Sequence, residues 1–68
     1  MADSLASRLK FLRTEKGLKQ SDMAKLLNIT VIQYQRYEYG KSFPRYMELL
    51  LLANFFDVSL DFLCGRDI

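Results

Sequence analysis

Two short helical patterns separated by only three residues lie in the middle of the chain and restrict its fold more than any other feature. The first, QSDMAKLL at residues 20–27, places apolar side chains along one helical face. Asn28 follows it and tolerates a left-handed backbone better than any residue except Gly, while Thr30 is a favourable N-cap. The second pattern, VIQYQRYEY, ends at Gly40. The sequence therefore predicts two helices joined by a sharp turn over residues 20–39.

Three further helical patterns flank this pair. The first covers residues 5–16 after an N-cap at Asp3 or Ser4, and the other two cover residues 46–56 and 60–64. No segment favours a strand. The 68 residues are 50% apolar and 26% charged, which suits one small core. We therefore predict an all-α, compact five-helix fold in which the whole chain, residues 1–68, is a single domain.

The charged residues are unevenly distributed along the chain. Residues 1–45 contain nine of the ten Lys and Arg residues but only four of the eight Asp and Glu residues, a net charge of +5. Residues 46–68 contain one Arg and four acidic residues, a net charge of −3. This asymmetry points to a polyanionic partner for the first two-thirds of the chain. The alternative is that scattered charges only keep a small protein soluble.

The composition argues against catalysis, metal binding and membrane insertion. One Cys and no His exclude an internal disulfide and a zinc site of His and Cys ligands. Cys64 is predicted to pack in the last helix, and the sequence has no Gly-rich phosphate loop. We expect no catalytic residue, no metal and no cofactor. The longest apolar run is too short to span a bilayer and the N-terminus lacks a signal-peptide core, so we expect a cytoplasmic protein.

A larger set of residues, from the first helical pattern to the last, has a spacing that is typical of one family. These residues are Leu9, Leu12, Arg13, Gly17, Leu18, Gln20, Met23, Ala24, Leu27, Thr30, Tyr37, Glu38, Gly40, Lys41, Pro44, Leu49, Leu52, Ala53, Val58, Asp61, Leu63 and Gly65. In these residues the chain resembles the Cro/phage-repressor type of helix-turn-helix domain, also called the xenobiotic response element family of bacterial regulators. The resemblance implies a lambda-repressor-like, sequence-specific regulator that binds double-stranded DNA. It would act as a repressor that reads a palindromic operator with the helix at residues 31–39.

The resemblance also implies which side chains touch DNA. By family position Val31, Ile32 and Arg36 face the bases, and helical geometry adds Gln35, one turn after Val31. Other side chains are expected to contact the sugar-phosphate backbone, which supplies affinity and salt dependence rather than sequence preference. These phosphate-contacting candidates are Gln20, Thr30, Tyr39, Lys41, Ser42 and Arg45.

Four other residues are expected to affect the stability of the fold and not to contact DNA. Arg13 and Glu38 match an arginine and a glutamate that pair in the family and hold the reading helix, so we expect a structural pair. Tyr34 replaces the aliphatic residue usual at a buried position, and its hydroxyl therefore needs a partner. Lys19 stands where the family prefers Ser or Thr as a cap, which weakens the start of the helix that follows.

Val31 and Ile32 depart from the polar residues that relatives often carry at these positions. Apolar side chains cannot hydrogen-bond base edges, but they can contact thymine methyl groups, and Arg36 can donate two bonds to guanine. We therefore hypothesise half-sites that contain T and G. The alternative is that Val31 or Ile32 belongs to the core, which would leave Gln33, Gln35 and Arg36 to read the bases.

Apolar residues beyond those needed for a core predict a partner surface. A protein that reads a palindrome needs a two-fold dimer, so we expect a homodimer with Leu50, Leu51, Leu60 and Phe62 as candidate interface residues. The alternative is that Leu50 and Leu51 join an enlarged core with Phe11 and Leu26. A second hypothesis for function is an antitoxin or adaptor that uses the same fold mainly to bind a protein partner.

Overall fold

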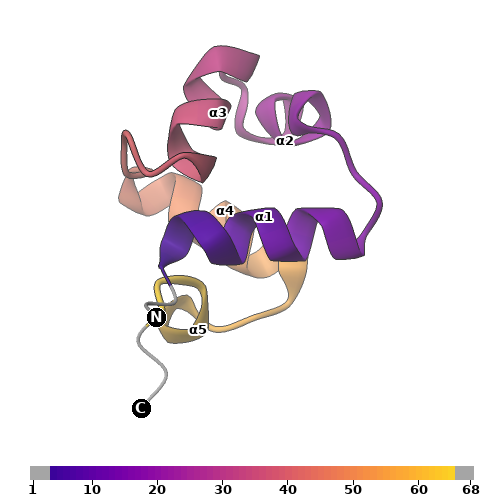
Figure 1. Ribbon diagram of the computed structural model, residues 1–68. Coiled ribbons are helices and arrows are strands. Elements are labelled where there is room, and N and C mark those ends of the chain that lie inside the picture. Colours follow the sequence, from indigo (N-terminus) through magenta and orange to yellow (C-terminus); the bar gives the residue numbers. More distant parts are fainter. Residues whose placement is uncertain (1–3, 66–68) are drawn as a thin grey trace.

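The computed structural model describes residues 4–65, which form five α-helices and no strand (Figure 1). The helices are α1 (Leu5–Glu15), α2 (Gln20–Leu27), α3 (Val31–Glu38), α4 (Tyr46–Phe56) and α5 (Leu60–Leu63). The prediction of an all-α, five-helix fold is confirmed, and no helix boundary differs from its predicted place by more than one residue. None of these helices is both long enough and apolar enough to cross a membrane.

Hydroxyl side chains determine where three of the helices begin. Ser4, Thr30 and Ser59 each accept a hydrogen bond from the backbone amide three residues later, at 3.3, 3.1 and 3.0 Å. Each bond satisfies an amide that the helix itself leaves unpaired, which stabilises a helix by about 1 kcal/mol. Of the two N-caps predicted for α1, Ser4 is the one observed, and Asp3 lies outside the described residues.

The two ends of α2 set its direction relative to α3. Lys19 has no oxygen in its side chain to cap α2, but its backbone amide donates to the Asp22 carboxylate at 2.8 Å. At the other end Asn28 adopts the predicted left-handed conformation, with φ of +58°. This left-handed residue ends α2 and turns the chain, so that α3 begins three residues later, at Val31.

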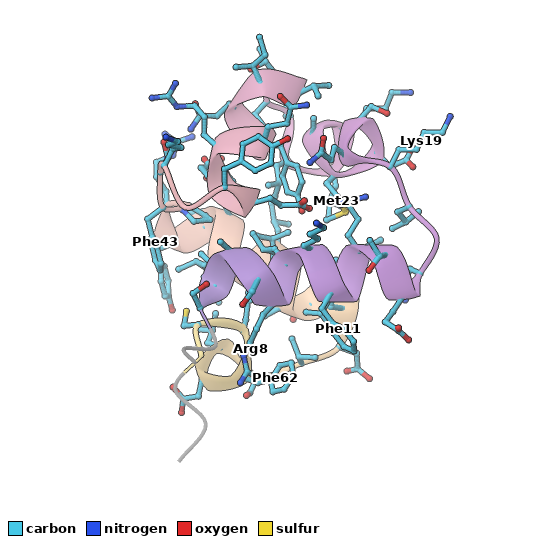
Figure 2. The ribbon with its side chains drawn as sticks, in the orientation of Figure 1. Arg8, Phe11, Lys19, Met23, Phe43 and Phe62 are labelled. Carbon is cyan, nitrogen blue, oxygen red and sulfur yellow. The ribbon has the colours of Figure 1, made fainter. Side chains whose placement is uncertain are left out.

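The core lies where all five helices meet. In Figure 1, α4 lies behind α1, α2 and α3 lie on one side of α1, and α5 lies on the other side. Met23 points from α2 toward α1 in Figure 2 and is buried. The buried apolar residues are Leu5, Leu9, Met23, Ala24, Leu27, Tyr34, Tyr37, Leu49, Leu52, Ala53, Phe56 and Leu63. Every helix contributes to this core, which therefore holds α3 by its inner face.

Candidate nucleic-acid interface

Helix α3 has one face in the core and the opposite face in solvent. Tyr34 on the inner face is fully buried. On the outer face Ile32 is 69% exposed and Val31 is 38% exposed. Arg36 is also exposed, and Gln35 is half-buried. The alternative in which Val31 or Ile32 belongs to the core is therefore wrong, and both apolar side chains stand on the accessible face of α3.

Basic and polar side chains follow α3 in the loop that leads to α4. Tyr39, Lys41 and Arg45 are exposed, and Ser42 is half-buried. The backbone amides of Lys41 and Ser42 both donate to the carbonyl oxygen of Arg36, at 2.8 and 3.2 Å. The Nε of Arg36 also lies 3.4 Å from the Ser42 hydroxyl oxygen. These bonds fold the loop onto the last turn of α3, so the charges of the loop lie beside the exposed face.

The two other phosphate candidates lie at the starts of helices. Gln20 is the half-buried first residue of α2, and Thr30 is the exposed N-cap of α3. Backbone amides at a helix N-terminus point outward unpaired and favour a bound anion such as a phosphate. Both residues therefore lie beside backbone amides that favour an anion.

A hydrogen-bonded cluster around Glu38 ties α3 to α1 and α2, and we call it the Glu38 cluster. Arg13 donates from Nε to Oε2 of Glu38 at 2.6 Å and from Nη2 to Oε1 at 3.1 Å. The hydroxyl of Tyr34 donates to Oε2 at 2.6 Å, which supplies the partner that a buried phenol requires. Gln20 donates from Nε2 to Oε1 at 3.2 Å, and Gln35 donates to Oε1 of Gln20 at 3.0 Å.

Burial and hydrogen bonding together keep the Glu38 cluster in one charge state. Burial by itself would raise the pKa of Glu38, but hydrogen bonds from Arg13, Tyr34 and Gln20 outweigh it and lower that pKa. The pKa of Tyr34 is raised, first because the phenol is buried and second because Glu38 accepts its hydrogen bond. At neutral pH the cluster is therefore a carboxylate held by a guanidinium, a neutral phenol and an amide.

The lowered pKa of Glu38 predicts a loss of stability in acid. A carboxyl group whose pKa is lower in the folded state contributes stability that is present above its ordinary value of 4.5. That stability is lost as the pH falls through the folded-state pKa. We expect carbon-13 NMR to show Glu38 titrating below its ordinary value of 4.5, and urea unfolding to show falling stability over the same range. A Glu38 carboxyl group that titrates at or above 4.5 would contradict this prediction.

Glu48 is a second buried carboxylate, which sequence reasoning missed. It is 4% exposed. Its carboxylate accepts a hydrogen bond from the Tyr37 hydroxyl at 2.7 Å and another from the backbone amide of Arg45 at 3.1 Å. The first bond joins α3 to α4, and the second closes the start of α4. A signal was present, because an acidic residue three positions after a residue that cannot cap is typical of a helix start.

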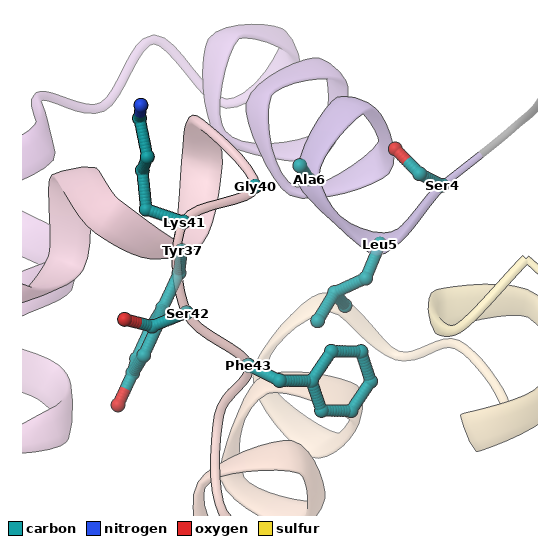
Figure 3. Close-up of a pocket in the computed structure, with 8 residues that line it drawn as sticks. All are labelled: Ser4, Leu5, Ala6, Tyr37, Gly40, Lys41, Ser42 and Phe43. Atoms are coloured by element: carbon teal, nitrogen blue, oxygen red, sulfur yellow. The ribbon is translucent and has the colours of Figure 1, made fainter.

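A hollow of about 390 Å³ lies between the start of α1 and the loop after α3 (Figure 3). It is lined by Ser4, Leu5, Ala6, Tyr37, Gly40, Lys41, Ser42 and Phe43. In Figure 3, Leu5 and Phe43 point toward one another, whereas the Lys41 side chain extends away from both. The hollow is therefore an apolar depression beside the basic loop. Within residues 4–65, no three His, Cys, Asp or Glu side chains are placed to hold a metal ion.

The four apolar residues considered for a dimer interface differ in their surroundings. Leu51 is 45% exposed, while Leu50, Leu60 and Phe62 are half-buried. The guanidinium of Arg8 lies over the Phe62 ring, 4.3 Å from its centroid, on the side of α1 away from α3 (Figure 2). The alternative of an enlarged core does not hold for Leu51, nor for Phe11, which is 56% exposed.

Helix α4 carries an exposed apolar stripe of which the sequence reasoning identified only one residue. Met47, Leu51 and Phe55 are spaced four residues apart and therefore share one helical face. Their exposed fractions are 68%, 45% and 39%. Tyr46 and Phe43, both more than 60% exposed, lie at the start of α4 and in the loop before it. We call Met47, Leu51 and Phe55 the α4 stripe.

These features together define a helix-turn-helix protein. A short helix is followed by a three-residue turn and by a second helix whose inner face is held by the Glu38 cluster and whose outer face is accessible. Residues 9–63 match the helix-turn-helix family, and the chain belongs to this family, in its Cro/phage-repressor type.

Named relatives have similar sequences over part of their length. The uncharacterized HTH-type transcriptional regulator YqaE of Bacillus subtilis strain 168 is 43% identical over 58 residues, which are 85% of this chain and 50% of that protein. The HTH-type transcriptional regulator ImmR of the same organism is 39% identical over 64 residues, which are 94% of this chain and 50% of that protein. The chain thus spans about half the length of these relatives.

Solved structures resemble the whole fold. A transcriptional regulator from Listeria innocua superimposes with a TM-score of 0.92 at 32% identity, over 100% of this chain and 64% of that one. The P22 c2 repressor, solved in complex with a synthetic operator, superimposes with a TM-score of 0.87 over 97% of this chain and 100% of that one. Its 20% identity makes this second similarity one of fold alone.

Proposed function

We propose that the chain binds double-stranded DNA in a sequence-specific way and represses transcription by reading a palindromic operator with α3. The observation that carries this proposal is the accessible face of α3, which the Glu38 cluster braces from behind and the basic loop borders. Relatives named as transcriptional regulators support the proposal, as does the similarity of fold to a repressor solved on its operator. The protein acts in the cytoplasm, where a bacterial operator is accessible.

Val31, Ile32, Gln35 and Arg36 enter the major groove in this proposal. The branched side chains of Val31 and Ile32 pack on thymine methyl groups, since they offer no hydrogen bond. Arg36 donates two hydrogen bonds to O6 and N7 of guanine. Exposure of both apolar side chains in the free protein supports this role, because burying them against DNA removes apolar surface from water.

The backbone contacts come from both sides of α3. They involve Gln20, Thr30, Tyr39, Lys41, Ser42 and Arg45. Only Lys41 and Arg45 among them carry charge, and each can displace one counterion from a phosphate. If both do so in both subunits of a dimer, the logarithm of the binding constant falls with the logarithm of salt concentration with a slope of roughly −3.6.

The proposal is tested by selecting binding sites from random duplex DNA and titrating the enriched site at several salt concentrations. We expect a palindrome with T and G in each half-site and the salt dependence given above. A protein that is folded by circular dichroism and yet enriches no site at low salt would overturn the proposal.

A homodimer is the second part of the proposal, because a palindrome presents two identical half-sites to one protein. The α4 stripe supplies an exposed apolar surface on a regular helix, which suits self-association. Leu50, at its edge, contributes in part. Leu60 and Phe62 pack mainly against their own chain, with Phe62 under Arg8, and they lie at the periphery.

Placing charge on the α4 stripe is expected to separate the dimer without unfolding the chain. Met47→Glu combined with Leu51→Glu puts two carboxylates into the proposed interface, and both positions are exposed in the single chain. Sedimentation velocity is expected to show a dimer for the unaltered protein and a monomer for the variant. Lys10→Glu on α1 is the matched control and should remain dimeric. An unaltered protein that is monomeric even when bound to its operator would contradict the prediction.

A further inference from the structure

We propose that Gln35 is a specificity-determining residue that selects adenine in each half-site, because Glu38 and Gln20 determine which way its carboxamide faces. The inference rests on the proposed DNA-binding function. It adds a base preference that follows from the direction of hydrogen bonds. The preferences for T and G proposed above follow only from the types of side chain on α3.

The direction of the carboxamides begins at Glu38. An ionised carboxylate only accepts hydrogen bonds, so any amide that bonds to Glu38 must present its nitrogen. Gln20 does so, with Nε2 at 3.2 Å from Oε1 of Glu38. Its oxygen is therefore directed away from Glu38 and accepts from Nε2 of Gln35 at 3.0 Å. The buried carboxylate thus sets the orientation of both amides.

Val31 does not compete with Gln35 for the oxygen of Gln20. Val31 lies one turn before Gln35 on the same face, and its side chain has no polar atom to bond the oxygen of Gln20. Gln35 itself is half-buried. Its side chain is held before DNA arrives, so less rotational freedom is lost when it binds a base.

The hydrogen bond from Gln35 to Gln20, which we call the bridge, leaves Gln35 with one free N–H and its carbonyl oxygen. In the major groove adenine offers a matching pair, because N6–H donates and N7 accepts. Guanine offers only acceptors, N7 and O6, and so cannot bond the free oxygen. A glutamine without the bridge can direct both of its N–H bonds at guanine, whereas the bridged Gln35 cannot. The bridge therefore increases the preference for adenine over guanine.

The experiment uses the operator selected by the unaltered protein, with each base pair of the half-site replaced in turn by the other three. We expect one position at which adenine is preferred over guanine by about tenfold or more, the range of a good bidentate contact. Gln35→Ala should abolish that preference at the same position. Gln35→Glu, which can only accept, should shift it toward cytosine, whose N4–H₂ donates.

Gln20→Ala separates the bridge from the contact itself. Gln20→Ala leaves Gln35 in place but removes the oxygen that its amide bonds. The ratio of adenine to guanine affinity should therefore fall in this variant. Both Gln35→Ala and Gln20→Ala are expected to remain folded. Loss of the phosphate contact of Gln20 weakens binding to all sequences equally and does not alter this ratio. Tyr34→Phe is the matched control, because it removes a different donor to Glu38 and leaves both bridging bonds intact.

The outcomes distinguish the inference from the proposed function. If the unaltered protein enriches no site, the proposed function fails. If it enriches a site but Gln35→Ala changes no base preference, or Gln35→Glu produces no shift, DNA binding stands and the role of Gln35 is overturned. An unchanged adenine-to-guanine ratio in Gln20→Ala would overturn the orienting role of Gln20.

Discussion

Replacing Glu38 by alanine is expected to lower the free energy of unfolding by about 3 to 5 kcal/mol, because it leaves the guanidinium of Arg13 buried without its partner. The Glu38 side chain is 1% exposed and the Arg13 side chain 12% exposed, so water cannot take the place of the carboxylate. A domain of 68 residues has a total stability of roughly 3 to 10 kcal/mol. We therefore expect circular dichroism and urea titration to show that the variant has lost a large part of its stability.

Two milder variants calibrate this result. Tyr34→Phe keeps the pair of Arg13 and Glu38 and removes one hydrogen bond to a charged group, so a loss of about 1.5 to 3 kcal/mol is expected. Arg45→Ala breaks an ion pair with Glu48 whose atoms are 3.8 Å apart and whose arginine side chain is 85% exposed. Its expected cost is below about 1 kcal/mol. The prediction fails if Glu38→Ala costs no more than Arg45→Ala.

Removing the Arg36 side chain is expected to weaken operator binding by roughly 30-fold to 20,000-fold. Each bidentate contact with guanine contributes about 1 to 3 kcal/mol, a dimer makes two such contacts, and each 1.4 kcal/mol corresponds to tenfold. Arg36 is exposed, so its removal should change the free energy of unfolding by less than about 0.5 kcal/mol. The measurement is the affinity of Arg36→Ala for the selected operator and for operators in which each guanine is replaced.

Arg36→Lys separates base recognition from charge. Lysine keeps the positive charge but lacks the planar fork of the guanidinium, so the variant should retain affinity for random DNA and lose most of the preference for guanine. Lys10→Ala, which removes an exposed cation from α1, should change neither quantity. If Arg36→Ala instead weakens binding equally for every sequence, Arg36 contacts phosphate rather than a base.

The positions of the helices were predictable because the signals for them are local. Hydroxyl caps such as Ser4 and Thr30 act over three residues, and the apolar period of a helix acts over one or two turns. The family resemblance placed Val31, Ile32 and Arg36 at the bases, whereas only the structure decided that neither Val31 nor Ile32 belongs to the core. The pairing of Arg13 with Glu38, 25 residues apart, came from the family resemblance, since no local rule joins residues at that separation.

The sequence by itself thus determined the five helices and their ends. The tertiary structure alone decided which polar groups are buried and which apolar groups are not. The burial of Glu48 and the direction of the Gln35 amide depend on side chains brought together from different helices. Helix α4 is apolar on several faces, so its sequence could not say how many of these faces the core would cover. The packing of α4 against the rest of the core made that choice, and it left Met47, Leu51 and Phe55 exposed.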